Sequence, residues 1–387
     1  MNTRLIIPSL ILPVLVISLP QLIIGLLLIE IAFSFDTEVG VAGQLGTTAS
    51  IVSAIMALLM GGLSVRYGHK SLLTTGLVIL CVAAIGCFLT PTFGLLLSVF
   101  ALTGISMAMV QPMSQTLIGT LFSVEERPKI IGYLWGGMAL SYVIGSPVIS
   151  VIEDWRLAFV IFVLPLTLFS LFLVIVGVPS TTPHNPSSRR YLQGFKEIAQ
   201  NKSAIACVVA NVLSVIAFRV IGFYGIPFYR QQFLVDKTLT SFILSGIALI
   251  YSAGSVIGGR LVNRFGRKKL TVIGACLNGV LAISFINMPS LWTSLLLFYS
   301  AGFTGSMRNA AYNSLALEQV PEYRGTMMSL SQLSANFAQA IGTGLGGLLL
   351  VSFDYGYIGF LGISAIIASL IFHLFTIDPT KKKGERL

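Results

Sequence analysis

Residues 259–269 read GRLVNRFGRKK and separate two long apolar runs, 242–258 and 270–288. A short basic stretch in such a place is typical of a loop that joins two membrane helices. Gly266 permits a tight turn in this loop, because a residue without Cβ adopts positive φ at little cost. The cations of the loop cannot lie in hydrocarbon, so they fix the side of the membrane on which the loop lies.

The same loop occurs once more, earlier in the chain, as GGLSVRYGHK at residues 61–70. Three residue pairs align at a separation of 198: Gly68 with Gly266, Arg66 with Arg264, and Lys70 with Lys268. Three further pairs keep nearly that separation: Gly104 with Gly302, Arg127 with Arg324, and Asp154 with Asp354. The separation is about half of the 387 residues, so one half of the chain is predicted to be a diverged copy of the other.

Composition indicates the class of protein. Apolar residues make up 55% of the chain and charged residues only 10%, and the mean hydropathy is +0.90. A soluble domain carries far more charge than this, so the sequence predicts an all-α, polytopic membrane protein. The net charge of +10 would suggest nucleic acid as the partner of a soluble protein. Here we assign it to membrane loops and expect no nucleic-acid partner.

No pattern for covalent chemistry or cofactor binding is present. The four cysteines lie inside apolar runs without a CxxC pair, the three histidines are scattered, and no GxxxxGK[ST] nucleotide loop occurs. The sequence therefore predicts no enzyme activity, no metal site and no cofactor.

A spanning helix needs about 20 mostly apolar residues. Division of the chain at charges and turn residues predicts twelve spans: 5–29, 42–63, 72–90, 94–121, 130–151, 157–178, 203–228, 240–259, 270–288, 291–317, 326–351 and 357–377. They form an N-terminal six-helix bundle (1–178) and a C-terminal one (203–387), joined by a linker at 179–202. An even number of spans in each half keeps the two halves parallel.

Basic residues predict the orientation. Nineteen of the 24 Lys and Arg residues fall on one side, whereas Arg156, Arg230 and Lys237 fall on the other. The positive-inside rule then places both termini and the linker in the cytoplasm, with the protein in the cell membrane.

The two basic loops resemble those of the major facilitator superfamily, and the resemblance covers essentially the whole chain. GGLSVRYGHK resembles the family signature between spans 2 and 3, G-x-L-x-D-R-x-G-R-K, and GRLVNRFGRKK resembles its repeat between spans 8 and 9. Ala42-Gly43-Gln44-Leu45 favours the branch of twelve-span drug:proton antiporters. The resemblance implies two pseudo-symmetric six-helix bundles that transport a solute by alternating access.

In the family the acidic residue of this loop signature helps to latch the cytoplasmic face. The resemblance therefore implies a gating role for eight residues: Gly61, Arg66, Gly68, Lys70, Asn263, Arg264, Gly266 and Arg267. The acidic position of the signature holds Val65 in the first loop and Asn263 in the second. Span 4 has Phe100 where proton antiporters typically carry arginine. A different or weaker latch is expected, and proton antiport is an expectation from the family alone.

Polar residues in spans 1, 4, 7 and 10 are candidates for substrate contact, because the resemblance places these spans around a central cavity. Two amide pairs occupy matching positions four residues apart, hence on one helical face: Gln111 with Gln115, and Asn309 with Asn313. Such amides either hydrogen-bond helices to one another or line a cavity. Their symmetric placement favours the cavity.

Arg219 of span 7 and Arg308 of span 10 fall near the middle of the membrane, and Gln21 of span 1 aligns with Arg219. No matching buried acid is present, which suggests an anionic substrate group, because guanidinium binds carboxylate or phosphate through paired hydrogen bonds. The alternative is that each arginine pairs with helix carbonyls or with Glu30, or extends toward water.

Glu30 lies toward the extracellular end of span 1 and is the one acidic residue near a span interior. Two interpretations stay open: its protonation couples transport to a proton gradient, or it is an interfacial residue just outside the lipid.

These features predict a secondary active transporter of a small organic solute, working as a monomer in the lipid bilayer. The first choice is a proton-coupled efflux permease. The alternative is an importer or exchanger of organic anions that uses Arg219 and Arg308. A transport-inactive sensor would be expected to carry an added soluble domain, and a channel would be expected to carry a filter loop.

Overall fold

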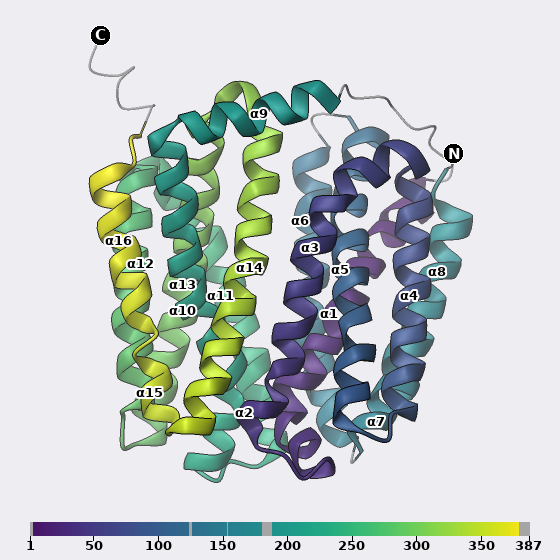
Figure 1. Cartoon of the computed structure of the whole chain (residues 1–387), viewed down its shortest axis with the longest axis vertical. Coiled ribbons are helices and arrows are strands. Elements are labelled where there is room, and N and C mark those ends of the chain that lie inside the picture. The colour runs from purple at the N-terminus through teal and green to yellow at the C-terminus, as the bar shows by residue number, and fades with distance from the viewer. Residues whose placement is uncertain (1–2, 124–125, 153, 180–187, 379–387) are drawn as a thin grey trace. The chain divides into compact units, whose positions relative to one another are not determined.

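The computed structural model describes residues 3–123, 126–152, 154–179 and 188–378, and these residues form helices without a strand (Figure 1). The first part of the chain holds α1 (Thr3–Ser34), α2 (Val39–Ala42), α3 (Gln44–Tyr67), α4 (His69–Leu89), α5 (Phe93–Leu121), α6 (Arg127–Val151), α7 (Trp155–Leu157), the π-helix η1 (Ala158–Val163) and α8 (Leu164–Gly177). The second part holds α9 (Ser188–Gln200), α10 (Lys202–Gln232), α11 (Lys237–Phe265), α12 (Arg267–Ile286), α13 (Leu291–Gln319), the 3-10 helix η2 (Pro321–Tyr323), α14 (Arg324–Ser352), α15 (Tyr355–Gly359) and α16 (Gly362–Phe375).

Eleven stretches among the described residues are long and apolar enough to cross a membrane. They match every predicted span except 291–317. That span is the 29-residue helix α13, which is long enough but carries Arg308, Asn309 and Asn313. By length alone, α13 would be a twelfth crossing. It is absent from the eleven apolar stretches because its polar residues lower its hydropathy.

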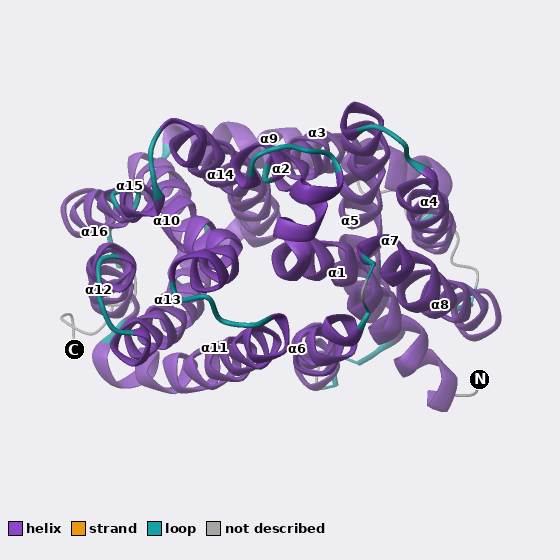
Figure 2. Ribbon diagram, turned by 90° about the horizontal axis from the view of Figure 1, so that it is seen from below, coloured by secondary structure: helices purple, strands orange, loops and turns teal. Residues whose placement is uncertain are grey.

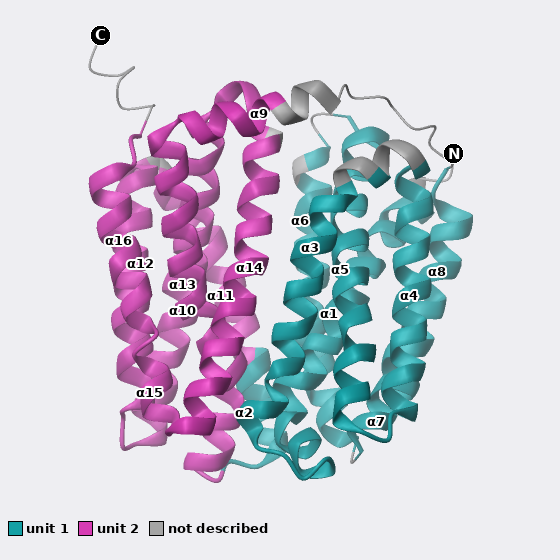
Figure 3. Ribbon diagram, in the orientation of Figure 1, with its two compact units in different colours: residues 1–186, 235–245 teal, residues 187–234, 246–387 magenta. Residues whose placement is uncertain are grey.

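The chain divides into two compact units (Figure 3). Unit 1 contains Met1–Pro186 and Val235–Ser245, and unit 2 contains Ser187–Leu234 and Gly246–Leu387. The division falls inside α11, whose first turns belong to unit 1 and whose remainder belongs to unit 2. The predicted linker, 179–202, is described only in part, since residues 180–187 lie outside the described ranges.

In unit 1, α1 packs against α5, α6 and α8, and α5 packs against α3 and α4. Gly104 is one of the glycines that align between the two halves of the chain. A Cβ at this position would collide with the backbone carbonyl of Ala49, so glycine lets α5 approach α3 closely. Helix α1 is interrupted at Leu27, whose φ of −109° and ψ of 22° are not helical. The segment that carries Glu30 therefore begins beyond a kink.

In unit 2, α13 packs against α10, α12 and α14, and α16 packs along α10 and α12 (Figure 2). The amphipathic helix α9 lies across the ends of α10 and α14 in Figure 1, with Ile198 buried in the core beside Ala204 and Cys207. Residues Lys196, Glu197 and Gln200 of α9 are exposed. One face of α9 thus packs on the helix ends while the other remains polar.

The two basic loops have the same backbone geometry. Gly68 and Gly266 precede α4 and α12 with φ of 75° and 84°, in a region that favours glycine. Lys70 Nζ donates to the Ile175 carbonyl at 2.9 Å, near the end of α8, and Lys268 Nζ donates to the Thr376 carbonyl at 2.7 Å, just past α16. In each unit a loop lysine thus satisfies a carbonyl at a helix C-terminus, where cations are favoured.

The first turns of α11 are fastened to α6 within unit 1. Ser146 Oγ lies 2.8 Å from Ser245 Oγ and 2.9 Å from the Ser241 carbonyl oxygen. Ser245 Oγ also lies 3.1 Å from the Val143 carbonyl, and Lys237 Nζ donates to the Ile152 carbonyl at 2.8 Å. These buried hydroxyl contacts require the close helix approach that small residues allow.

Candidate functional site

Arg308 is the most buried cation in the described part of the chain, with only 2% of its surface exposed. Its Nη1 donates a hydrogen bond of 3.0 Å to Asn211 Oδ1 on α10, and its guanidinium lies 5.9 Å from the Tyr312 ring centroid. Among the described residues no carboxylate forms an ion pair with Arg308. A buried cation therefore relies on an amide and an aromatic ring, which leave its charge unneutralised.

Three other helices make room for Arg308 and hold its partner. Asn211 Nδ2 reaches Ser334 Oγ on α14 at 3.5 Å, the outer limit of a hydrogen bond. On α12, Gly274 faces Arg308, because a Cβ at Gly274 would lie 2.8 Å from the Arg308 Cβ. Arg308 thus lies where α10, α12 and α14 all border α13.

Arg219 contrasts with Arg308. It lies on α10, its side chain is exposed, and it makes no hydrogen bond or ion pair with the rest of the described chain. Its positive charge nevertheless acts unfavourably on Arg308. Unit 2 therefore carries two mutually repelling guanidinium groups, and an anion between them would be attracted by both.

The predicted amides of unit 2 differ from each other. Asn309 is half-buried, and its Nδ2 donates to Tyr251 Oη on α11 at 3.2 Å. The Tyr251 ring packs at 5.6 Å from that of Phe218, one residue before Arg219. Asn313 is also half-buried but forms no hydrogen bond with another described residue.

The predicted amides of unit 1 have hydrogen-bonding capacity left over. Gln21 Nε2 on α1 is buried and has no acceptor among the described protein atoms. Gln111 and Gln115 on α5 are half-buried, with no hydrogen bond to other described side chains. Glu30 is half-buried on the last turns of α1, where its backbone carbonyl accepts from Ser34 Oγ at 2.8 Å.

The gating candidates fall at the ends of α3, α4, α11 and α12. Gly61, Arg66 and Asn263 lie in helical segments, and the structure describes only their backbone. Arg264 is exposed, with its guanidinium 5.5 Å from the Phe265 ring centroid. Arg267 lies 3.7 Å from Glu318, which also pairs with Arg324 at 3.1 Å. In unit 1, His69 takes the position of Arg267, and its Nδ1 is buried without a partner in the described chain.

Sequence reasoning missed Asn211 and Ser334. An amide within the apolar run VVANVLS of span 7 was a signal of the same kind as those used for Gln111 and Asn309. Its role depends on its partner, Arg308, which lies 97 residues away in the chain. The described residues contain no group of three or more His, Cys, Asp or Glu side chains that could hold a metal ion.

Comparisons with known proteins cover nearly the whole chain. The family model described as Major Facilitator Superfamily matches residues 10–233 and 207–387. The uncharacterized MFS-type transporter YceJ of Bacillus subtilis (strain 168) is 24% identical over 361 residues, covering 90% of each chain. The quinolone resistance protein NorB of Staphylococcus aureus (strain MRSA252) is 20% identical over 424 aligned residues, covering 92% of this chain and 91% of NorB.

A solved structure extends the likeness to the fold. The crystal structure of a D-xylose-proton symporter superposes with a TM-score of 0.82 at 16% sequence identity, covering 98% of this chain and 99% of the symporter. At that identity the likeness concerns the arrangement of helices.

Proposed function

This chain belongs to the Major Facilitator Superfamily and is therefore a membrane transporter, and we propose that it is a proton-coupled efflux permease for a small organic solute. The proposal includes transport by alternating access, with the candidate residues of α1, α5, α10 and α13 contacting the solute. The names of NorB and of the multidrug resistance protein 1 of Bacillus subtilis support efflux. The name of the D-xylose-proton symporter supports a proton as the coupling ion.

The observation that carries the substrate class is the environment of Arg308. A cation that is 2% exposed and hydrogen-bonded, among the described residues, to a single amide would stabilise an incoming carboxylate or phosphate. The exposed Arg219 would supply a second cation to the same anion. We therefore propose that the transported solute carries an anionic group. This arrangement favours an organic-anion importer or exchanger as the second candidate, which differs from the first in direction and coupling.

Transport into and out of liposomes distinguishes the two candidates. Purified protein in sealed vesicles, with a pH gradient of either sign, would be offered a panel of anionic, cationic and neutral solutes. Proton-driven export of an anionic solute from the protein's cytoplasmic side is the expected result. Counterflow of anions without dependence on the pH gradient would instead favour the exchanger. Transport of cations only, unaffected by changes at either arginine, would contradict the anionic substrate.

Variants at the arginines test the site itself. Arg219→Gln and Arg308→Lys are expected to weaken anion transport by tenfold or more, because each removes a paired donor set. Asn211→Asp is the most specific variant. It would put a carboxylate 3.0 Å from Arg308, which would neutralise the charge of Arg308 while both side chains keep their size. Arg260→Gln is the matched control, since Arg260 is an exposed cation at the end of α11. Equal losses in Arg260→Gln would point to general electrostatics instead.

A further inference from the structure

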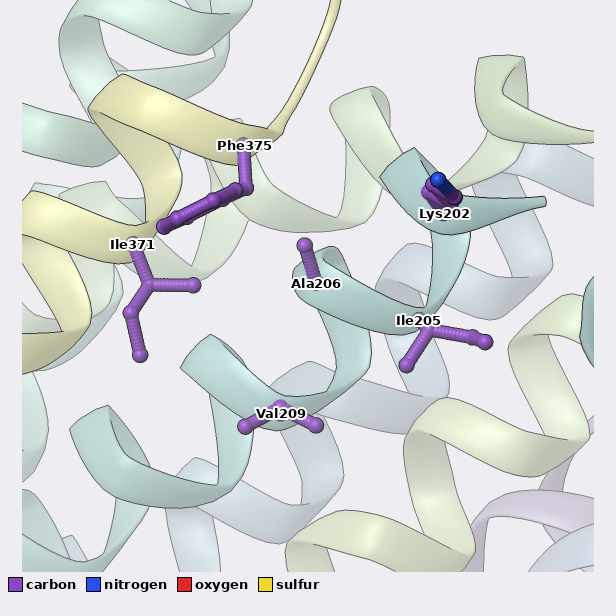
Figure 4. A pocket seen from close by; sticks show the side chains of 6 residues that line it. All are labelled: Lys202, Ile205, Ala206, Val209, Ile371 and Phe375. Atoms are coloured by element: carbon purple, nitrogen blue, oxygen red, sulfur yellow. The ribbon is translucent and has the colours of Figure 1, made fainter.

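A groove opens in unit 2 between the beginning of α10 and the end of α16 (Figure 4). It has a volume of about 330 Å³ and is lined by Lys202, Ile205, Ala206, Val209, Ile371 and Phe375. The two helices pack along each other, and the small side chain of Ala206 lies between the larger ones in Figure 4. The groove is therefore a feature of two spanning helices, and its lining includes neither Arg308 nor Asn211 or Tyr312.

The walls of the groove are apolar and open to the surroundings. Ile205 is 42% exposed, Val209 46% and Phe375 62%. Three such side chains around a hollow would be costly in water, but all belong to membrane spans. A hydrocarbon chain that follows the hollow would contact apolar atoms on both sides, whereas a flat helix surface offers contact on one side only.

One end of the groove is cationic. Lys202 is the first residue of α10, its side chain is exposed, and it forms no ion pair or hydrogen bond with another described residue. The first turn of α10 is already capped, because Asn201 Oδ1 accepts from the backbone N–H groups of Ser203 and Ala204. The ammonium group of Lys202, and not the helix terminus, is therefore the available partner for an anion.

The cationic end lies where the candidate span of α10 begins and that of α16 ends. Helix α9 immediately precedes Lys202 and exposes Lys196, Glu197 and Gln200. Clustered cations next to a span attract anionic lipid headgroups, and a lysine at a span end directs its ammonium toward them.

We propose that the α10–α16 groove binds one anionic phospholipid. Its phosphate lies on Lys202, and one acyl chain lies against Ile205, Val209 and Phe375. The preference for an anionic lipid over a zwitterionic one comes from net charge, since a choline ammonium would be repelled by Lys202.

Native mass spectrometry of the purified full-length chain tests the proposal. The protein would be mixed with equal amounts of phosphatidylglycerol and phosphatidylcholine bearing identical acyl chains. The parent is expected to retain several-fold more phosphatidylglycerol than phosphatidylcholine, and Lys202→Gln is expected to lose that preference. Lys202→Arg should keep it, and so should Lys269→Gln, an exposed cation at the start of α12 that controls for total charge. Equal losses in Lys202→Gln and Lys269→Gln, or no preference in the parent, would overturn the proposal.

A photoreactive acyl chain locates the lipid. Phosphatidylglycerol with a diazirine in its acyl chain is expected to label peptides that contain residues 205–209 and 371–375. Ala206→Phe fills the groove and should reduce that labelling several-fold while Lys202 remains. Labelling spread evenly over the spans, or unchanged by Ala206→Phe, would overturn the assignment. A monodisperse elution profile for each variant shows that the chain remains folded.

Discussion

Arg308 shows how a buried charge is held by groups that do not neutralise it. Its guanidinium has five N–H donors, and the described structure supplies one acceptor, Asn211 Oδ1, and one aromatic ring, Tyr312. The remaining donors lie in the interior of unit 2, near a second cation, Arg219. The stability of the protein around Arg308 is therefore expected to fall when Asn211 is lost and to rise when an anion binds.

Replacement of Asn211 by Ala is expected to lower the free energy of unfolding by about 1.5–3 kcal/mol, the range for hydrogen bonds to charged groups. Asn309→Ala removes a hydrogen bond between neutral groups, Asn309 and Tyr251, and is expected to cost about 1 kcal/mol. Unfolding of both variants in mixed micelles titrated with denaturing detergent measures the difference. Equal costs would mean that Asn211 does not stabilise the charge of Arg308.

At the residue scale, sequence reasoning could find the polar residues within spans but not their partners. Arg308, Asn309 and Gln111 stand out because polar groups are rare in apolar runs. The pairing of Arg308 with Asn211, and of Asn309 with Tyr251, depends on helix rotation and crossing, which a pattern along one span does not contain. Which of these residues contact a substrate stays a prediction.

The turn between α11 and α12 depends on one glycine. Gly266 has φ of 84° and ψ of 149°, a region that residues with Cβ enter at a cost of about 1–3 kcal/mol. Gly266→Ala is therefore expected to destabilise unit 2 by that amount, although a Cβ would meet nothing within 4 Å. Gly259→Ala is the matched control: Gly259 lies inside α11 with equally open surroundings, and alanine there should stabilise by about 0.5–1 kcal/mol.

Detergent unfolding and melting temperatures of the two glycine variants give the comparison. Opposite signs are expected. A loss of stability in Gly259→Ala as large as that in Gly266→Ala would show that backbone conformation is not the reason for the glycine.

The fastening of α11 to α6 can be tested by cross-linking. In a background without the four native cysteines, Ser146→Cys with Ser245→Cys is expected to form a disulfide rapidly under mild oxidation, since the two Oγ atoms lie 2.8 Å apart. Ser146→Cys with Thr238→Cys is the control. Thr238 precedes Ser245 by seven residues, about 10 Å along the helix, so it should not cross-link. Gel mobility with and without reductant reports both pairs.

At the element scale, the sequence predicted the helices well and their contacts less well. The apolar runs correspond to helices because every backbone group must be satisfied inside hydrocarbon. The serines of α6 and α11 gave no comparable signal, since a serine in a span also bonds its own helix, as Ser146 does with the Tyr142 carbonyl.

At the scale of the whole chain, the status of α13 decides whether the number of crossings is even or odd. Twelve crossings place both termini on one side, whereas eleven would place them on opposite sides. Reporter fusions at the two termini are expected to give the same cytoplasmic reading. A reporter inserted at residues 287–290, between α12 and α13, should read outside. Opposite readings at the termini would mean that α13 does not cross the membrane.

The family and the fold could be recognised from the sequence, because the separation of the two basic loops and the lengths of the apolar runs are visible in the sequence itself. The extent of the two compact units could not. The sequence suggested a division at the linker, but the side-chain contacts of α6 attach Val235–Ser245 to unit 1. These eleven residues belong to unit 1 although they are distant from the rest of it in the chain. No local sequence pattern predicts such an assignment.

Because residues 235–245 belong to unit 1, a chain divided into two fragments at the linker should behave in a particular way. If the polypeptide is cut between Pro179 and Ser188, the first fragment lacks eleven residues of its own compact unit, and the second fragment carries them. Each fragment expressed alone is therefore expected to be degraded, while the two expressed together should recover each other by complementation. Helix α11 would then serve as the shared piece through which two separately synthesised halves reassemble.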